Sequence, residues 1–396
     1  MSATSASSEI RVLRAENVGL GADRMADALA RAFERWRDRN YARRRDAIAA
    51  IADLAGYSVA MLENSIDALL KPFTSDALKA MAARVSADNR DGKPKTVGFI
   101  AAGNVVGAGI HEIAIALIAG ARVLIKTASA EPIFLAEFAR TLDEIDREAG
   151  TRVEVFNWGR RRTDLTDELI AKCERVVAYG DDATIASLRP RSDVIGFGSR
   201  VSAALIDASC IDGVAELLAR DVALFEQLGC LSLHQVFVVS PDVSAARDLA
   251  IRMSAALERI GDSMLPARIP LRDAAEIRGV RERARWRAIA GDPVELFEGP
   301  GFEWTVVFEA KADSFKVSPG FRTVHVTAVS DLAEFRESIG NMSRRIEAMA
   351  VAGDDCEIET RAMGIPYVCA PGEMQSPPLD WRHGGGEFLD VMVGPR

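Results

Sequence analysis

The sequence predicts an α/β fold in which a doubly wound parallel sheet is followed by a second α/β layer. Its 396 residues, 48% of them apolar, exceed what one hydrophobic core usually serves. From about residue 96 onward, short apolar runs alternate with helical patterns. Gly229 and Cys230 separate an amphipathic helix end from an apolar strand, which exposes a thiol at an element boundary. We therefore expect two α/β domains and a candidate cysteine nucleophile.

Charge and apolar patterning exclude several classes of partner. The chain carries 49 basic and 58 acidic residues, for a net charge of −9. Its one short basic cluster, Arg43 to Arg45, is interpreted as a solvated helix face, so no nucleic-acid partner is expected. The first residues lack a basic region followed by an apolar one, and no apolar run approaches the ~18 residues of a membrane helix. We expect a soluble, cytoplasmic protein.

Five cysteines are scattered along the chain, at positions 173, 210, 230, 356 and 369. None forms the close pairs used by metal sites or redox dithiols, so we expect reduced thiols and no metal. Four of them are interpreted as small core or structural residues, the usual role of free cysteine. Cys230 alone occupies a turn.

The N-terminal region, residues 1 to about 90, is predicted to be helical. Residues 24–55 carry apolar side chains at helical spacing, and a polar linker with glycine and proline follows at 86–95. Strands are then expected at 96–102, 122–126, 153–156 and 175–179, and helices at 111–119, 131–147, 164–173 and 182–188. This alternation predicts the parallel, doubly wound sheet.

The second layer begins near Arg200. We expect strands at 201–206, 235–239, 304–308, 323–329 and near 367, helices at 211–225, 245–259 and 273–288, and a strand or helix end at 346–351. The predicted division is therefore 1–95, a helical lead-in packed on the next domain; 96–200, the first sheet; and 201–396, the thiol-bearing domain. The C-terminal segment of the last region can return to the middle domain.

Ligands of open α/β sheets bind outside the carboxyl ends of the strands, which directs attention to the loops after Ala102, Lys126 and Tyr179. The first loop contains Asn104 between Gly103 and Gly107. A tight turn with Asn104 as a cap or left-handed residue would account for this sequence. Local sequence alone favours this interpretation, and the functional alternative is an amide donor held where an oxyanion forms.

The other two loops also allow two interpretations. Lys126, with the hydroxyls that follow it, suits a ribose or phosphate, whereas Ser129 before Glu131 equally suits helix capping. Gly180 would border the same crevice, or belong to an ordinary Gly/Asp turn that caps a helix.

Two histidines are candidate partners of the thiol. His234 lies four residues after Cys230, but this spacing on a strand does not guarantee contact. His383, before a run of glycines, is the other free candidate, while His111 and His325 look structural. The roles of His234 and His383 stay open.

The order of these features resembles the aldehyde dehydrogenase superfamily. The resemblance rests on Asn104, the segment 119–132 with Lys126, Gly180 and Gly229-Cys230, at separations close to those of that fold. It extends from about residue 96 to the C-terminus. Within the superfamily, the segments 195–202, 221–232 and 374–381 are most similar to the acyl-CoA reductases of the LuxC family.

The resemblance implies an aldehyde dehydrogenase-like fold with a Rossmann-type NAD(P)-binding domain and reduction of a fatty acyl thioester to the aldehyde. It implies NADPH as reductant, with NADH as the alternative, and CoA or an acyl carrier protein as the thioester donor. Cys230 would be the acylated nucleophile, with Asn104 and the Cys230 backbone amide as oxyanion donors. Lys126 would contact the adenosine ribose or its 2′-phosphate, and Ser129 and Gly180 would border the cofactor. A homo-oligomer is expected.

Two departures from the superfamily bear on the chemistry. The segment 196–200 has no carboxylate where oxidising aldehyde dehydrogenases carry a water-activating glutamate, and the second glutamate, expected near 317–322, is also missing. Hydrolysis of an acyl-cysteine is therefore disfavoured. Three alternatives stay open: an aldehyde dehydrogenase or acyl-phosphate reductase on the same fold, a cysteine-dependent acyltransferase or thioesterase, and a non-catalytic subunit.

Overall fold

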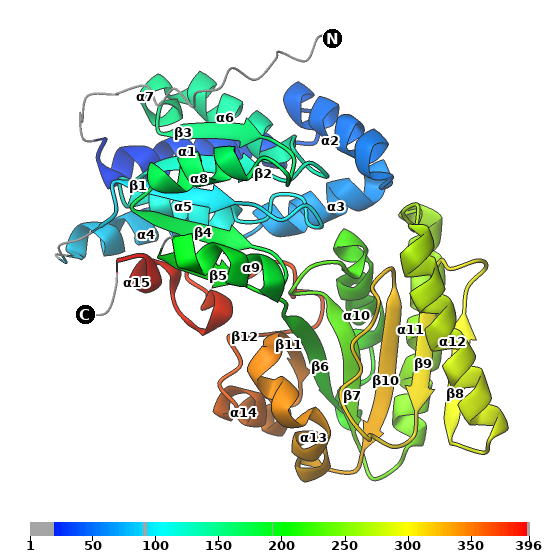
Figure 1. Ribbon diagram of the computed structural model, residues 1–396. Coiled ribbons are helices and arrows are strands. Elements are labelled where there is room, and N and C mark those ends of the chain that lie inside the picture. Colours follow the sequence, from blue (N-terminus) through cyan, green and yellow to red (C-terminus); the bar gives the residue numbers. More distant parts are fainter. Residues whose placement is uncertain (1–19, 89, 91–92, 192, 394–396) are drawn as a thin grey trace.

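The computed structural model describes residues 20–88, 90, 93–191 and 193–393, and it has two lobes, each built on one sheet (Figure 1). The upper lobe contains a five-stranded sheet and the N-terminal helices, and the lower lobe contains a seven-stranded sheet. The α/β fold with a doubly wound sheet is thus confirmed.

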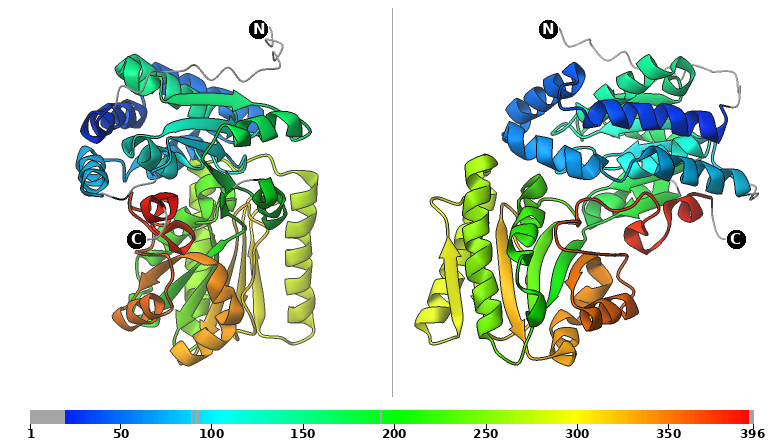
Figure 2. Two further views of the ribbon diagram at one scale, coloured as in Figure 1. Left: turned by 60° about the vertical axis from the view of Figure 1, so that its left-hand side comes forward. Right: turned by 180° about the vertical axis from the view of Figure 1, so that it is seen from behind.

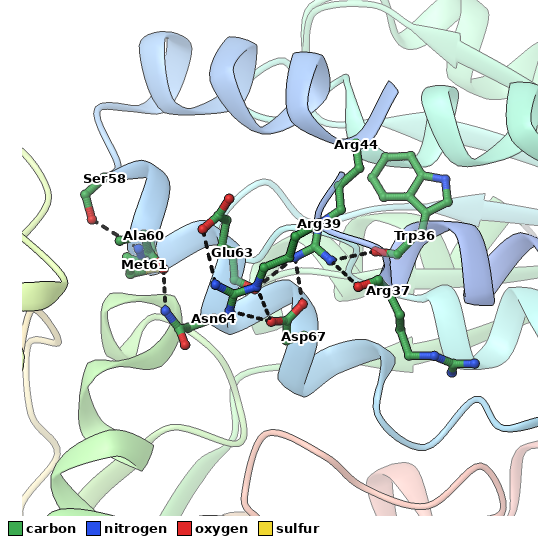
Figure 3. Close-up of polar contacts among 10 residues, drawn as sticks. All are labelled: Trp36, Arg37, Arg39, Arg44, Ser58, Ala60, Met61, Glu63, Asn64 and Asp67. Atoms are coloured by element: carbon green, nitrogen blue, oxygen red, sulfur yellow. Dashed lines mark hydrogen bonds and ion pairs between the residues drawn. The ribbon is translucent and has the colours of Figure 1, made fainter. Parts of the chain in front are cut away.

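Four helices open the described chain: α1 (Ala22–Arg37), α2 (Ala42–Ala55), α3 (Val59–Leu70) and α4 (Ser75–Ala87). The part of the predicted lead-in before residue 20 lies outside the described residues. The stretch 24–55, predicted from its helical spacing, forms two helices. Arg44 of the second helix binds the end of the first. Its guanidinium donates to the carbonyls of Trp36 and Arg37, at 2.8 and 3.0 Å, and so satisfies the end of α1 (Figure 3).

The interpretation of Arg43 to Arg45 as a solvated face is wrong for two of the three residues. Arg44 is fully buried, and it also donates to the Asp67 carboxylate at 2.6 Å. Arg43 is half-buried and pairs with Glu137 at 2.6 Å, whereas Arg45 is exposed. Helical spacing alone could not reveal these partners, because they come from α3 and α6.

The first sheet has the strand order β3-β2-β1-β4-β5, with every pairing parallel. Its chain order changes direction between β1 and β4, which creates the switch point where such sheets bind ligands. One face packs on α1 to α6, and the other packs on α8 and α9. The elements are β1 (Thr96–Ile100), α5 (Ile110–Ile118), β2 (Arg122–Thr127), α6 (Phe134–Ile145), α7 (Arg147–Gly150), β3 (Val153–Asn157), α8 (Thr163–Ala171), β4 (Arg175–Tyr179), α9 (Asp182–Leu188) and β5 (Val194–Phe197).

The second sheet has the order β12-β11-β6-β7-β10-β9-β8 and is parallel except for its edge strand β8. Helices α10 and α11 pack on one face, and α12, α13 and α14 pack on the other. The elements are β6 (Val201–Asp207), α10 (Val214–Ala223), β7 (Leu233–Val239), α11 (Ser244–Ser263), α12 (Leu271–Ile289), β8 (Val294–Glu298), β9 (Thr305–Glu309), β10 (Thr323–Val329), α13 (Leu332–Ile339), β11 (Ile346–Ala352), α14 (Asp354–Ala362) and β12 (Tyr367–Cys369).

After β12 the chain crosses back to the upper lobe, where it ends in α15 (Phe388–Val393) beside α5, as the views of Figure 2 show. The Phe388 ring lies 6.4 Å from that of Phe99 on β1, and Arg175 donates to the Val391 carbonyl at 2.7 Å. This crossing carries residues 370–387 along the boundary between the lobes. The division of the chain into three functional regions remains a prediction.

Within the described residues, we looked for membrane-spanning helices and for clusters of metal-ligating side chains. In 20–88, 90, 93–191 and 193–393, no helix is both long enough and apolar enough to cross a membrane. Across the same residues, no three His, Cys, Asp or Glu side chains gather where they could hold a metal ion.

Candidate active site

A cavity of ≈ 1310 Å³ lies between the two sheets, and both lobes contribute to its wall. This volume exceeds the ~300–1,000 Å³ of ordinary small-molecule sites, so it has room for two ligands at once. Every residue singled out as a candidate from the sequence lines it, namely Asn104, Lys126, Ser129, Gly180, Cys230, His234 and His383. Loops that are far apart in the sequence therefore form one site.

Cys230 follows a strained turn. Phe225, Glu226 and Gln227 have φ values of 54°, 50° and 61°, a left-handed run that side-chain-bearing residues rarely adopt. Each such residue costs on the order of 1–3 kcal/mol and persists only where surrounding contacts enforce it. The predicted helix over 211–225 accordingly ends earlier, with α10 stopping at Ala223.

Buried polar contacts hold this turn in place. The Gln227 amide donates to the carbonyls of Leu233 and Thr323, at 2.5 and 2.7 Å, and its oxygen accepts from the Thr323 N–H at 2.8 Å. The Glu226 carboxylate pairs with Arg322 at 2.9 Å. The turn is therefore clamped to the start of β10, and the Phe225 N–H also donates to the Ser65 hydroxyl of α3 at 2.9 Å.

Asn104 lies beside the thiol-bearing loop. Its side-chain amide donates to the Leu228 carbonyl at 2.6 Å, two residues before Cys230. Asn104 has no positive φ, and Gly109 is the N-cap of α5, so the interpretation as a left-handed or capping residue is excluded. The Cys230 carbonyl in turn accepts from the Ser202 hydroxyl at 2.7 Å, which fixes the loop to β6.

The carboxyl ends of the first sheet's strands form the other wall. Lys126 lines it from β2 and Ser129 from the following loop. Ser129 does not cap α6, because Glu131 accepts from the N–H groups of Ile133 and Phe134, at 2.9 and 2.8 Å. Burial lowers the pKa of Lys126, and the neighbouring charge of Arg160 lowers it further. Two cations thus share this end of the crevice.

Gly180 lies where β4 ends. A side chain at this position would approach Thr184 to 3.2 Å, so glycine lets β4 end close against the start of α9. The alternative interpretation of this segment also holds in part, because Asp181 caps α9 by accepting from the Thr184 N–H at 2.7 Å.

The histidine beside Cys230 is His383, not His234. His383 and Cys230 both line the cavity, and the thiol is close enough to the imidazole to raise the pKa of His383. His234 instead accepts the Ser318 N–H at Nδ1, at 3.1 Å, and burial lowers its pKa to about 4. His111 is buried against the Pro377 carbonyl, as expected of a structural residue.

Two buried carboxylates in the cavity wall escaped the sequence analysis. Glu112 lies 2.7 Å from Nδ1 of His383, and Glu347 accepts the Gly384 N–H at 2.8 Å while pairing with Arg200 at 3.1 Å. Both carboxylates are engaged, so neither is free to activate water. Glu112 did carry a signal, because it is the one acidic residue in the mostly apolar helix α5 and such a charge needs a partner.

Three other cysteines behave as structural residues. Burial raises the pKa of Cys173 and of Cys356 to about 12, and it raises that of Cys369 as well. A nucleophile needs the thiolate form, which these sites disfavour.

The model of the family described as acyl-CoA reductase (LuxC) matches residues 20–394. The chain belongs to this family. The resemblance inferred from about residue 96 onward is thereby confirmed, and the match extends further, over the N-terminal helices. The oxidoreductase class is confirmed with it.

Curated relatives agree with the family assignment. The long-chain acyl-protein thioester reductase of Aliivibrio fischeri is 24% identical over 342 residues, which cover 81% of this chain and 70% of that protein. The enzyme of the same name from Photorhabdus laumondii is 28% identical over 246 residues, which cover 56% of this chain and 51% of that protein. The LuxC chain thus matches between half and about 70% of the length of these relatives.

Solved structures confirm the aldehyde dehydrogenase-like fold. Aldehyde dehydrogenase 21 from Physcomitrella patens, in complex with succinate, superposes with a TM-score of 0.70 over 94% of this chain and 84% of its own, at 12% identity. Succinic semialdehyde dehydrogenase from Streptococcus pyogenes, in complex with NADP⁺, gives a TM-score of 0.65 over 94% and 87%, at 15% identity. At these identities the likeness concerns the fold alone.

Proposed function

We propose that this LuxC chain reduces a fatty acyl thioester to the aldehyde at Cys230, with NADPH as the reductant. The observation that carries the proposal is the position of Cys230 on a clamped turn that faces the ligand-binding end of a doubly wound sheet across one cavity. The names of the curated relatives supply the class of substrate, a long-chain acyl thioester.

The crevice suits a nicotinamide dinucleotide. A side chain at Gly103 would approach Ala128 to 2.8 Å, so only glycine lets the first and second loops of the sheet meet there. Lys126 and Arg160 would hold the adenosine ribose or its 2′-phosphate, because two neighbouring cations favour a phosphate. Ser129 and Gly180 would border the same ligand. When bound, the nicotinamide supplies a hydride to the acyl carbon.

The protein's own residues would carry out acyl transfer. The Cys230 sulfur attacks the thioester carbonyl, and the carrier thiol, CoA or the pantetheine of an acyl carrier protein, departs. The second N–H of the Asn104 amide and the Cys230 backbone N–H would stabilise the oxyanion. The buried carboxylates Glu112 and Glu347 are both paired, so neither is placed to activate water, and we expect the acyl-cysteine to await reduction.

One observation favours a second candidate. A cysteine beside a histidine that is oriented by a glutamate also suits a thiol acyltransferase or thioesterase. Such an enzyme would release the carrier thiol at the same rate with and without a nicotinamide cofactor. The dinucleotide-sized crevice beside Cys230 is the reason to prefer the reductase.

The test is consumption of NADPH, followed by the absorbance of the reduced nicotinamide, with a panel of acyl-CoA and acyl carrier protein thioesters. We expect aldehyde and free carrier thiol in equal amounts. Cys230→Ala should abolish aldehyde formation, whereas Cys210→Ala, which removes a partly exposed cysteine outside the cavity wall, should retain it. Aldehyde formation by Cys230→Ala at the wild-type rate would refute the proposal.

A further inference from the structure

His383 occupies a position that no sequence motif assigns. It lies in the segment that crosses between the lobes after β12, in a short helical turn, His383–Gly385. Its Nδ1 is 2.7 Å from Oε1 of Glu112, and the two side chains are 9% and 3% exposed. The Cys230 thiol lines the same cavity and lies within electrostatic reach of the imidazole. Residues from α5, the thiol loop and the C-terminal segment therefore meet at one place in the cavity wall.

The orientation of the ring is fixed. Phe197 stacks on one side, with centroids 3.8 Å apart and an interplanar angle of 11°, and Trp381 stacks at 4.4 Å and 19°. Because Glu112 occupies Nδ1, Nε2 is the nitrogen left for Cys230. A histidine held in this way presents one nitrogen to its target in a single plane, as an acid–base catalyst requires.

The charges around the ring favour the imidazolium. Burial opposes the charge, but Glu112 and Cys230 together raise the pKa of His383 to about 10. Burial likewise works against ionisation of Glu112, yet His383 lowers the pKa of that carboxyl to about 2. The other groups facing the ring are Glu347, whose partner is Arg200, and the neutral side chains of His111 and Tyr179. None of them adds a competing positive charge at contact distance.

We propose that His383, held by Glu112, is the acid–base partner of Cys230 in acyl transfer. The imidazolium stabilises the Cys230 thiolate, whose electron pair forms the new bond to the thioester carbon. The bond from that carbon to the carrier sulfur then breaks. The departing thiolate takes the Nε2 proton and leaves as a thiol, so that acyl-Cys230 and a neutral His383 remain. No oxidant or reductant enters this step, and only its substrate rests on the proposed function.

A reagent that needs no substrate tests the pair directly. Iodoacetamide alkylates the thiolate, so its rate at Cys230, read by peptide mass spectrometry from pH 6 to pH 8.5, reports the thiolate fraction. In the wild type we expect the rates at pH 6 and at pH 8.5 to differ by less than about threefold. In His383→Gln we expect the rate at pH 6 to be about a hundredfold lower than the rate at pH 8.5, as for an ordinary thiol. Glu112→Gln should lie between them.

Controls separate this effect from misfolding. The partly exposed Cys210 provides an internal reference whose alkylation profile should be the same in every variant. His234→Gln removes a second buried histidine from the same cavity and should keep the wild-type profile of Cys230, because His234 bonds to Ser318. If His383→Gln does not fold, Glu112→Gln, which preserves the shape of the side chain, decides the question.

Identical Cys230 profiles in the wild type and both variants would overturn the proposal. A second measurement, single-turnover release of CoA from an acyl-CoA without NADPH, should slow at least a hundredfold in His383→Gln. If the wild type is not acylated by any thioester although its alkylation profile is flat, the proposed function fails while the role of His383 stands. If acylation occurs at the same rate in the wild type and in His383→Gln, the role of His383 fails while the proposed function stands.

Discussion

The Glu226 carboxylate and the Arg322 guanidinium form an ion pair at 2.9 Å, and each side chain is 1% exposed. Phe321 and Arg322 have φ values of 50° and 58°, so the pair joins two left-handed turns. The Phe321 N–H also donates to the Glu226 carbonyl at 2.8 Å. Two strained turns, one leading to Cys230 and one preceding β10, thus hold each other.

Arg322→Met should destabilise the protein by about 3–5 kcal/mol, because it leaves the Glu226 carboxylate buried without its partner. Chemical denaturation measures this loss as a change in the free energy of unfolding. Arg252→Met is a matched control, since the Arg252–Asp212 pair is 49% and 88% exposed and should contribute less than about 1 kcal/mol. Equal effects of the two substitutions would show that the buried pair does not hold the turn.

Lys126→Met and Arg160→Met should weaken the binding of NADPH more than that of NADH. Loss of a hydrogen bond to a charged group costs ~1.5–3 kcal/mol, which predicts a rise of roughly tenfold or more in KM for NADPH. Lys79→Met, at an exposed lysine outside the cavity wall, is the control. A rise of equal size for both cofactors would place these cations on the ribose common to both, and no rise would remove them from the site.

Asp221 predicts a pH dependence of stability. It is fully buried at the end of α10 and accepts from the N–H groups of Gly372 and Met374, at 2.6 and 3.2 Å, which anchors the crossing segment that leads to His383. Burial raises its pKa to about 7, from an ordinary value of 3.8. Between these values the folded state holds a proton that the unfolded state has lost, so this group's contribution to stability falls as pH rises.

The measurement is the free energy of unfolding of the wild type and of Asp221→Asn at pH 5 and pH 8. We expect the wild type to lose stability relative to Asp221→Asn as the pH rises, by on the order of 1 kcal/mol per pH unit. Parallel pH profiles for the two proteins would show that Asp221 is ionised at both pH values.

Much of the first sheet could be predicted because its strands contain short apolar runs that alternate with helices. The strand at 96–102 was expected two residues longer than β1, while the one at 175–179 matches β4. The sequence analysis does not predict the edge strands β5 and β8, because β5 has only four residues and β8 interrupts its apolar residues with two glutamates. Helices α13, α14 and α15 are short, and their apolar faces are fixed only by tertiary packing.

The part of the site at the carboxyl ends of the first sheet's strands could be predicted from the sequence. Lys126 and Gly180 lie at the carboxyl ends of β2 and β4, the two strands that flank β1 in a parallel sheet, so their convergence followed from the topology. The partner of Cys230 did not follow from it, because His383 is more than 150 residues away and reaches the thiol only through the crossing of the C-terminal segment. No local pattern encodes that crossing.

The most direct test of the account is the mass of the intact protein after incubation with a long-chain acyl-CoA in the absence of NADPH. We expect one acyl group on Cys230 that persists in water and is released as aldehyde when NADPH is added. Cys230→Ala should acquire none. An adduct that disappears as free acid at the same rate with and without NADPH, or the lack of any adduct on the wild-type protein, would contradict the account.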